Sequence, residues 1–253
     1  MQLTCLGTGT GLLSKERAPS GLLVRVGETD LLFDSGSGTM GRLLAVEVEP
    51  TRLDVLYYTH VHTDHTADLI PLLQAMDLAK RTRDLHLTAP SAFWDFMDGL
   101  LAVQPWAKPK SFQLLRHSAE TSPFCRESPT RDGAGWSVAT APTRHIPGSL
   151  GYRLESGGQV VVYSGDAAFC QDLVQLGRDA DVLILECSYP DRLGQPDHLT
   201  PSQAGRIAAE AHARHLVLTH FYPVCQEAEI EAQAKKVFPG QLTLARDGLV
   251  LTI

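Results

Sequence analysis

Short apolar runs alternate with helical patterns along most of the chain, and several of these runs end in a histidine or a carboxylate. The runs are rich in Val, Leu and Ile, which is typical of buried strands. Between them, apolar residues recur every three or four positions, the spacing of one helix face. We therefore predict an α/β fold, with strands at residues 3–6, 22–26, 30–33, 53–58, 85–88, 136–141, 151–154, 160–164, 181–185 and 215–219.

The helical patterns fall at residues 40–46, 66–79, 91–101, 200–211 and 227–236. The fourth has a clear beginning, because Thr200 is followed by Pro201 at the first helical position and by Gln203 in a capping-box spacing. Residues 241–245 and 248–252 are predicted to close the chain as a strand pair. Residues 104–135 are interrupted by prolines, and we assign no role to them.

The strand at 53–58 leads directly into a string of metal-ligating residue types, Thr59-His60-Val61-His62-Thr63-Asp64-His65. In an extended chain, residues i and i+2 project to the same side, so His60 and His62 can hold one ion together. The chain then turns toward the next helix, which leaves Asp64 and His65 free to face a second ion. Nitrogen and carboxylate ligands at this density suit zinc or a similar divalent ion better than they suit a polar surface loop.

Other predicted strands also end in a potential ligand. His145 follows the strand at 136–141, Asp166 follows 160–164, and His220 follows 215–219. In layered α/β folds, binding sites gather at the strand ends along one edge of a sheet. A single histidine at a strand end is usually structural, but the repetition of this pattern indicates one shared site. Asp34, at the end of another strand, is expected to be buried and to accept backbone hydrogen bonds as a support for the ligands.

Composition and charge restrict the choice of function. The 253 residues suffice for one large domain or two small ones. The net charge of −7 is the wrong sign for a general nucleic-acid binder, which normally presents a basic face to phosphates. Five cysteines without a close pair favour reduced thiols and a cytoplasmic location over a disulfide framework. No signal-peptide pattern and no apolar run of membrane-spanning length is present in the sequence, so we expect no membrane association.

The ligand string, followed in order by His145, Asp166 and His220, resembles the full ligand set of the metallo-β-lactamase superfamily. Within it the chain looks most like ribonuclease Z. The matching segments are Leu6-Gly7-Thr8-Gly9, Phe33-Asp34-Ser35-Gly36, Gly151-Tyr152-Arg153, Glu186-Cys187-Ser188-Tyr189, His198-Leu199-Thr200 and Leu218-Thr219-His220-Phe221. The resemblance covers nearly the whole chain. It implies a single domain over residues 1–253, folded as a four-layer αββα sandwich of two mixed sheets.

The resemblance also implies roles for individual residues. It gives His60, His62 and His145 to one metal, Asp64, His65 and His220 to the other, and makes Asp166 the bridge between them. The two ions are expected to be zinc, with manganese or iron also accepted by these ligands. A hydroxide between the ions would act as nucleophile. Asp64 would also orient or deprotonate the water, and His198, held by Glu186, would donate a proton to a substrate oxygen.

Three departures from ribonuclease Z bear on the substrate. That family carries a long Gly/Pro-rich arm after its Gly-Tyr-Arg segment, which grips the tRNA elbow, whereas here residues 151–153 run through a tight Gly157-Gly158 turn into the next strand. Asp68 and Ala167 stand where the family usually has glycine and threonine. The missing arm and the acidic net charge argue against tRNA as a partner.

We therefore predict a binuclear metal-dependent phosphodiesterase acting on small or short phosphodiesters, such as cyclic nucleotides, ribosyl cyclic phosphates or RNA ends. The alternatives are hydrolysis of a thioester, lactone or sulfate ester, tRNA 3′ processing, and a metal-binding regulatory module without turnover. The physiological substrate is not predicted by the sequence. A homodimer is expected only because two-fold dimers are the commonest soluble assemblies.

Overall fold

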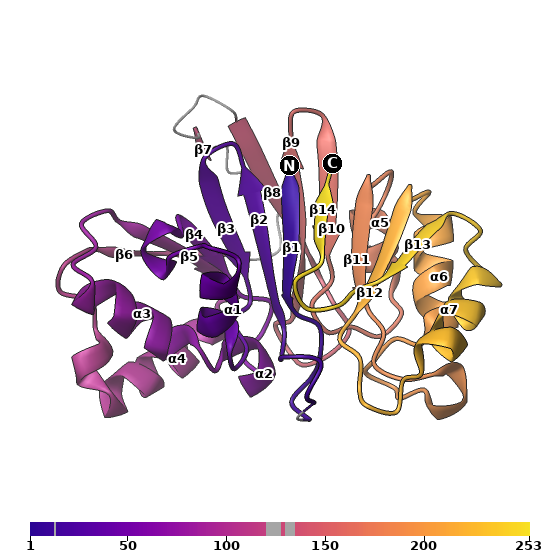
Figure 1. The fold of residues 1–253 in the computed structure, drawn as a ribbon, viewed down its shortest axis with the longest axis horizontal. Coiled ribbons are helices and arrows are strands. Elements are labelled where there is room, and N and C mark those ends of the chain that lie inside the picture. Colours follow the sequence, from indigo (N-terminus) through magenta and orange to yellow (C-terminus); the bar gives the residue numbers. More distant parts are fainter. Residues whose placement is uncertain (13, 120–127, 130–134) are drawn as a thin grey trace.

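The computed structural model describes residues 1–12, 14–119, 128–129 and 135–253 (Figure 1). Within these ranges, two seven-stranded sheets face each other, and helices cover both outer faces. This is the four-layer αββα sandwich with two mixed sheets, so the predicted fold class is confirmed.

The first sheet is antiparallel from β14 to β3 and parallel from β3 to β6. In spatial order its strands are β14 (Val250–Thr252), β1 (Gln2–Gly7), β2 (Gly21–Val26), β3 (Thr29–Phe33), β4 (Val55–Tyr57), β5 (Leu85–Ala89) and β6 (Leu114–Ser118).

The second sheet has the same mixed character, with parallel pairs from β13 to β10 and antiparallel pairs from β10 to β7. Its strands, in spatial order, are β13 (Gln241–Leu244), β12 (His215–Thr219), β11 (Val182–Glu186), β10 (Gln159–Tyr163), β9 (Leu150–Ser156), β8 (Gly135–Pro142) and β7 (Ser128–Pro129). Because β8, β10, β11 and β12 run in one direction, their last residues meet at one edge of the sheet.

Helices α1 to α4 lie over the first sheet and α5 to α7 over the second (Figure 1). Their bounds, with the short 3-10 helices, are α1 (Thr39–Ala45), η1 (Pro50–Arg52), α2 (Thr63–Thr66), α3 (Leu69–Leu78), α4 (Ala92–Val103), η2 (Pro105–Ala107), α5 (Gln171–Leu176), η3 (Asp191–Leu193), α6 (Pro201–Glu210) and α7 (Glu227–Lys235). The capping box of α6 is present, since the Gln203 side chain accepts a hydrogen bond from the Thr200 backbone N–H at 3.0 Å.

Three apolar layers explain why the strands read as continuous hydrophobic runs. In β4, Val55 and Tyr57 point between the two sheets, while Leu56 points toward the helices. In β11, Ile184 faces the space between the sheets and Leu183 faces α5 and α6. Alternate residues therefore enter different cores, and both faces of β4 and of β11 are buried.

The predicted closing strand pair is wrong. Strand β13 runs parallel to β12 in the second sheet, whereas β14 pairs antiparallel with β1 in the first. Both strands are present, but their sequences carry no information about their partners, and the chain crosses from one sheet to the other between them. The patternless region from 104 onward also contains β6, a partly exposed edge strand, and α5 was not predicted. Residues 120–127 and 130–134 of this region lie outside the described residues.

Candidate metal centre

The predicted ligand string leaves the first sheet at the end of β4 and enters α2. His60 is the third residue after the strand, His62 immediately precedes α2, and Asp64 and His65 lie within its single turn. The helix thus begins at Thr63, three residues earlier than predicted. This turn brings Asp64 next to His220 and His65 next to Asp166, both at strand ends of the second sheet. His60 and His62 remain on the extended segment before the helix.

The first group of potential ligands combines both sheets. Ligand atoms of His60, His62, His145 and Asp166 all lie within 4.8 Å of one another. The Nε2 atom of His145 is 3.1 Å from Nδ1 of His62 and 3.6 Å from Oδ2 of Asp166. Nε2 of His60 lies 3.9 Å from the same carboxylate oxygen. The four donors surround a space of the size that one cation requires.

The second group lies on the other side of Asp166. Ligand atoms of Asp64, His65 and His220 again lie within 4.8 Å of one another, and Nε2 of His220 is 3.3 Å from Oδ2 of Asp64. Oδ1 of Asp166 is 3.1 Å from Nε2 of His65 and 3.2 Å from Nε2 of His220. One oxygen of Asp166 therefore faces each group, as a bridging carboxylate would.

The hydrogen bonds of this cluster fit a divalent metal. Among the described residues, three buried atoms that face the two groups lack a hydrogen-bond partner, namely Nε2 of His60, Nε2 of His65 and Oδ1 of Asp166. A buried polar atom without a hydrogen bond lowers the stability of the fold unless a bound ligand interacts with it. The other ring nitrogens of both histidines are already hydrogen-bonded, which leaves the unpaired nitrogens as the ones available to a cation.

Asp34, at the end of β3, organises the half of the cluster that belongs to the first sheet. Its carboxylate accepts hydrogen bonds from the Thr59 backbone N–H and hydroxyl, both at 2.9 Å, and from Nδ1 of His65 at 2.7 Å. The hydroxyl of Tyr163 donates to it from the second sheet at 3.1 Å. The Thr59 hydroxyl also lies 2.9 Å from Nδ1 of His60. The prediction that Asp34 is buried and accepts backbone hydrogen bonds is confirmed.

Glu186, the last residue of β11, has the same function in the second sheet. One oxygen, Oε1, lies 2.8 Å from Nδ1 of His198 and accepts from the Ala167 backbone N–H at 2.8 Å. The other, Oε2, accepts from the Ser188 hydroxyl at 2.6 Å, and this hydroxyl in turn lies 3.0 Å from Nδ1 of His220. The predicted Glu186–His198 pair is therefore in place. The bridging hydroxyls of Thr59 and Ser188 were not predicted, although both lie beside predicted residues.

Three backbone positions at the cluster adopt left-handed conformations. Asp34 has φ 56° and His220 has φ 60°, values that non-glycine residues rarely adopt. The hydrogen bonds of the two side chains must stabilise these backbone conformations. Gly165, immediately before Asp166, has φ 57°, and a Cβ there would lie 2.6 Å from Cβ of Thr59. Only glycine allows the second sheet to approach Thr59 this closely.

The charge states follow from burial and proximity. Burial lowers the pKa of His60 well below its ordinary value, and nearby His65 lowers it further, so this ring is neutral. Burial raises the pKa of the Asp166 carboxyl, but His220 and His65 hold it well below its usual range. Neutral imidazole and ionised carboxylate, the forms of His60 and Asp166, are the ones that bind metals. Burial lowers the pKa of His65, but Asp166 and Asp34 raise it well above its ordinary value, so a metal ion at His65 would displace a proton. Burial also lowers the pKa of His198, but the hydrogen bond and charge of Glu186 raise it to about 9.

Comparison with known proteins agrees with this geometry. The β-lactamase superfamily domain matches residues 29–221. The chain is a metallo-hydrolase of the β-lactamase superfamily. It is 30% identical over 253 residues to the probable metallo-hydrolase YhfI of Bacillus subtilis, covering 99% of each chain. It is 29% identical to ribonuclease Z of Mycobacterium bovis, covering 98% of this chain and 96% of that one.

Solved structures give the same relationship for this metallo-hydrolase. The crystal structure of YhfI superposes with a TM-score of 0.85 at 26% identity, covering 99% of this chain and 98% of the other. The short form of human tRNase Z superposes with a TM-score of 0.80 at 25% identity, covering 100% and 99% of the two chains. The ribonuclease Z-like resemblance noted in the sequence is thus confirmed.

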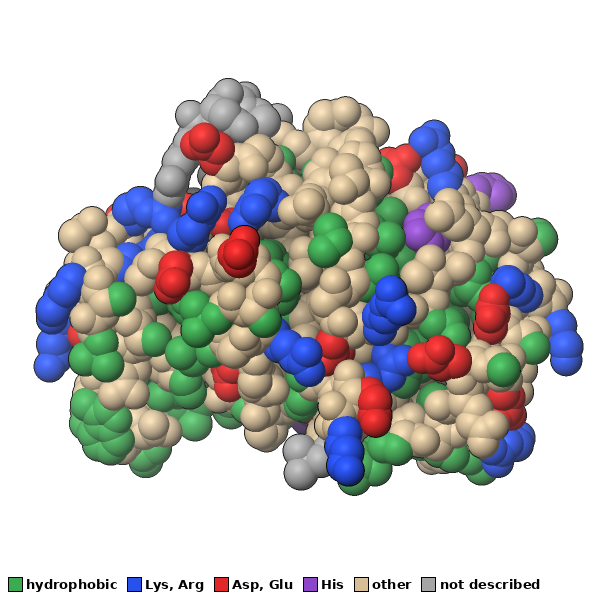
Figure 2. Space-filling view, viewed as in Figure 1, with side chains coloured by type: hydrophobic (Ala, Val, Ile, Leu, Met, Phe, Trp, Pro, Cys, Tyr) green, Lys and Arg blue, Asp and Glu red, His purple; other side chains and the backbone are tan. Residues whose placement is uncertain are grey.

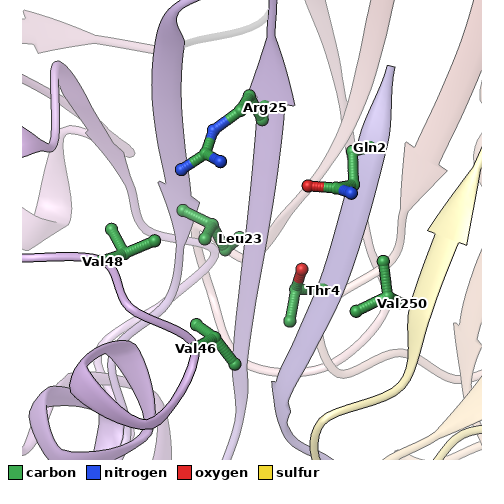
Figure 3. Close-up of a pocket in the computed structure, with 7 residues that line it drawn as sticks. All are labelled: Gln2, Thr4, Leu23, Arg25, Val46, Val48 and Val250. Carbon is green, nitrogen blue, oxygen red and sulfur yellow. The ribbon is translucent and has the colours of Figure 1, made fainter.

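The described residues also form cavities that contain none of the proposed metal ligands. One of about 100 Å³ lies on the outer face of β1 and β2, where Val46 and Val48 approach Leu23 (Figure 3), and it contains none of the predicted site residues. The other, of about 300 Å³, lies between α2, α3 and α4, with Phe96 and Leu100 in its wall. Among the described residues, no helix is long and apolar enough to cross a membrane.

Proposed function

We propose that this metallo-hydrolase cleaves small or short phosphodiesters, with His60, His62, His145, Asp64, His65, His220 and Asp166 holding two divalent metal ions. The observation that carries the proposal is the Glu186–His198 pair beside the two ligand groups. His198 lies 5.1 Å from His145 and 6.0 Å from His220, measured between ring centroids. A proton donor at this place suits a reaction in which an alkoxide leaves.

When bound, the two metal ions would polarise the phosphoryl oxygens and supply a nucleophile at neutral pH. The protein's own contribution is to fix the surrounding groups. The Glu186 carboxylate keeps Nδ1 of His198 protonated and directed away from the substrate, which leaves the Nε2 proton for the leaving oxygen. Burial raises the pKa of Asp64, but the hydrogen bond with His220 and the charge of His65 hold it below its usual range. Ionised Asp64 can therefore act as a metal ligand and as the acceptor of a proton from the water.

The turn between β9 and β10 supports a small substrate over tRNA. Only Gly157 and Gly158 separate the two strands, with φ values of 57° and 77°. Two consecutive residues with positive φ form the tightest hairpin turn, which leaves no room for an arm. Positive and negative side chains are interspersed on the face shown in Figure 2. Similarity to ribonuclease Z keeps tRNA 3′ processing as the second candidate.

The test is hydrolysis of bis(p-nitrophenyl) phosphate by protein loaded with zinc or manganese. We expect turnover by the wild type, and a loss of roughly 100-fold or more in kcat for His198→Ala with metal content unchanged. His212→Asn is the matched control, because it replaces an exposed histidine that precedes β12, at the opposite end of that strand from His220, and asparagine tolerates the positive φ of this position. It should behave as the wild type. A protein that binds two metals and cleaves no phosphodiester would contradict the proposal.

Parallel assays separate the remaining alternatives. A panel of thioesters, lactones and sulfate esters tests whether the same centre prefers another bond. A regulatory module without turnover would be indicated by well under one metal per chain after zinc reconstitution. The proposed cytoplasmic location rests on the cysteines, of which Cys5, Cys170, Cys187 and Cys225 are free. Sedimentation velocity of the purified protein tests the expected homodimer.

A further inference from the structure

Two tyrosines form a stacked pair at the border of the proposed active site. Tyr189 follows β11 and Tyr222 follows β12, and their rings lie 4.7 Å apart with an interplanar angle of 17°. Each is followed by a proline, Pro190 and Pro223, which restricts the tyrosine backbone to extended conformations. The Tyr222 backbone N–H donates to the Ser188 carbonyl at 3.4 Å, so the two loops are held together.

This pair, which we call the tyrosine wall (Tyr189 and Tyr222), stands directly beside the proton donor. The Tyr189 ring centroid is 5.9 Å from that of His198, and Tyr222 is 6.3 Å from both His198 and His220. These contacts are edge-to-face, at angles of 61° to 84°. The wall therefore borders the side of the centre where a leaving oxygen would receive its proton.

The wall differs from the other tyrosines near the cluster. Tyr152 and Tyr163 are buried, and their hydroxyls donate to the Tyr58 carbonyl at 2.7 Å and to Asp34 at 3.1 Å. Their place in the structure is accounted for by these bonds. Tyr189 and Tyr222 are only half-buried, so part of the stacked pair faces solvent beside a hydrolytic centre. Flat, exposed aromatic surface at such a place is suited to a flat ligand.

We propose that the tyrosine wall binds the base of a nucleotide whose phosphate faces the metal centre, so that the substrates are nucleotide diesters rather than diesters of ribose or other sugars alone. The inference rests on the proposed phosphodiesterase function and specifies its substrate class. In a cyclic nucleotide, the base and the leaving oxygen belong to the same nucleoside. A base at the wall is then on the same side as the oxygen that His198 would protonate.

The test measures binding without turnover. Titration calorimetry of the zinc-loaded protein compares adenosine 5′-monophosphate with ribose 5-phosphate, which differ only by the base. Stacking on aromatic side chains changes affinity by roughly five- to a hundred-fold per base, so we expect a preference of this size for the nucleotide. Tyr222→Leu and Tyr189→Leu should each remove most of the preference and leave the affinity for ribose 5-phosphate unchanged, whereas Tyr222→Phe should keep it.

Phe96→Leu is the matched control, because it removes an aromatic ring from the cavity beside α4 and should not change the preference. Equal affinity of the wild type for the two ligands would overturn the inference. So would a preference lost in Phe96→Leu, or equal weakening of both ligands in the two leucine variants. If nucleotides bind preferentially but no diester is cleaved, only the proposed function fails. If diesters with and without a base are cleaved equally well, only the proposed binding of a base by the tyrosine wall is contradicted.

Discussion

Asp34 and Glu186 are two buried carboxylates that form the same kind of hydrogen-bond network with histidines, one in each sheet. Each is located at the end of a parallel strand and holds Nδ1 of one histidine directly, His65 at 2.7 Å and His198 at 2.8 Å. Each also reaches a second histidine through a hydroxyl. Thr59 connects Asp34 with His60, and Ser188 connects Glu186 with His220.

The difference between them lies in what their histidines face. His65 is fully buried, and its Nε2 atom, which has no hydrogen-bond partner, faces Asp166. A bound cation would give this nitrogen a partner. The His198 side chain is 11% exposed, and its ring borders the tyrosine wall. One carboxylate–histidine arrangement therefore suits a metal ligand when it is buried among other donors. The same arrangement suits a proton donor when it opens toward substrate.

The largest effect is expected from Asp34→Asn. The change removes the charge that orients His65 and Thr59, and loss of such supporting groups typically lowers metal affinity by roughly 10- to 100-fold. Zinc competition against a chelator measures this, and thermal unfolding will report a lower Tm. Asp30→Asn is the control, since Asp30 is an equally buried carboxylate of the same strand that pairs with Arg25 and Arg52 instead. It should lower the Tm without changing zinc affinity; equal zinc affinity in both variants would contradict the proposed role of Asp34.

Glu186→Gln should distinguish the role of Glu186 from that of Asp34, because it should lower turnover more than metal binding. The glutamine no longer stabilises a protonated His198, and loss of general-acid catalysis typically costs about 100-fold or more in rate. We expect kcat to fall to this extent and zinc affinity to change only a few-fold, through His220. Single-turnover hydrolysis and the chelator competition measure the two effects. A variant that loses zinc as Asp34→Asn does would make Glu186 a support of the metal site alone.

How much of the two carboxylate networks and their ligands could be predicted from the sequence depends on how close together the residues lie along the chain. The string from His60 to His65 is readable because its members are adjacent in sequence and follow an apolar strand. The second half is scattered over residues 145–220, and apart from the family resemblance only the repeated strand ends pointed to it. The pairing of Glu186 with His198 depended on resemblance, because twelve positions separate them in sequence but their atoms are 2.8 Å apart. The hydroxyls of Thr59 and Ser188 escaped prediction because serine and threonine beside a ligand are too common to carry a signal.

A moderate effect is expected in the pH dependence of turnover, which should reflect the deprotonation of His198. Burial lowers its pKa, but Glu186 raises it to about 9, so a His198 acid is protonated at neutral pH and its activity falls as pH rises through about 9. The sign for stability is the same. A pKa raised from its ordinary 6.5 stabilises the folded state fully below about 6.5, and this contribution is lost as pH rises through about 9. In Glu186→Gln the residual activity should decline at a lower pH. An unchanged alkaline limb in the kcat profile would assign that limb to another group.

The smallest effects are expected from the bridging hydroxyls, and they test whether the two networks act separately. Replacing a hydroxyl that makes a buried hydrogen bond costs about 1 kcal/mol, or roughly five-fold in an equilibrium constant. Thr59→Val should weaken zinc binding by about this factor and leave kcat at saturating zinc unchanged, because the Thr59 hydroxyl hydrogen-bonds Asp34 and His60 of the Asp34 network. Ser188→Ala should lower both quantities, since Ser188 lies within 3.2 Å of His198 as well as 3.0 Å of His220. If both variants change zinc affinity alone, the Glu186 network supports metal binding in the same way as the Asp34 network, and the division between ligand and proton donor is wrong.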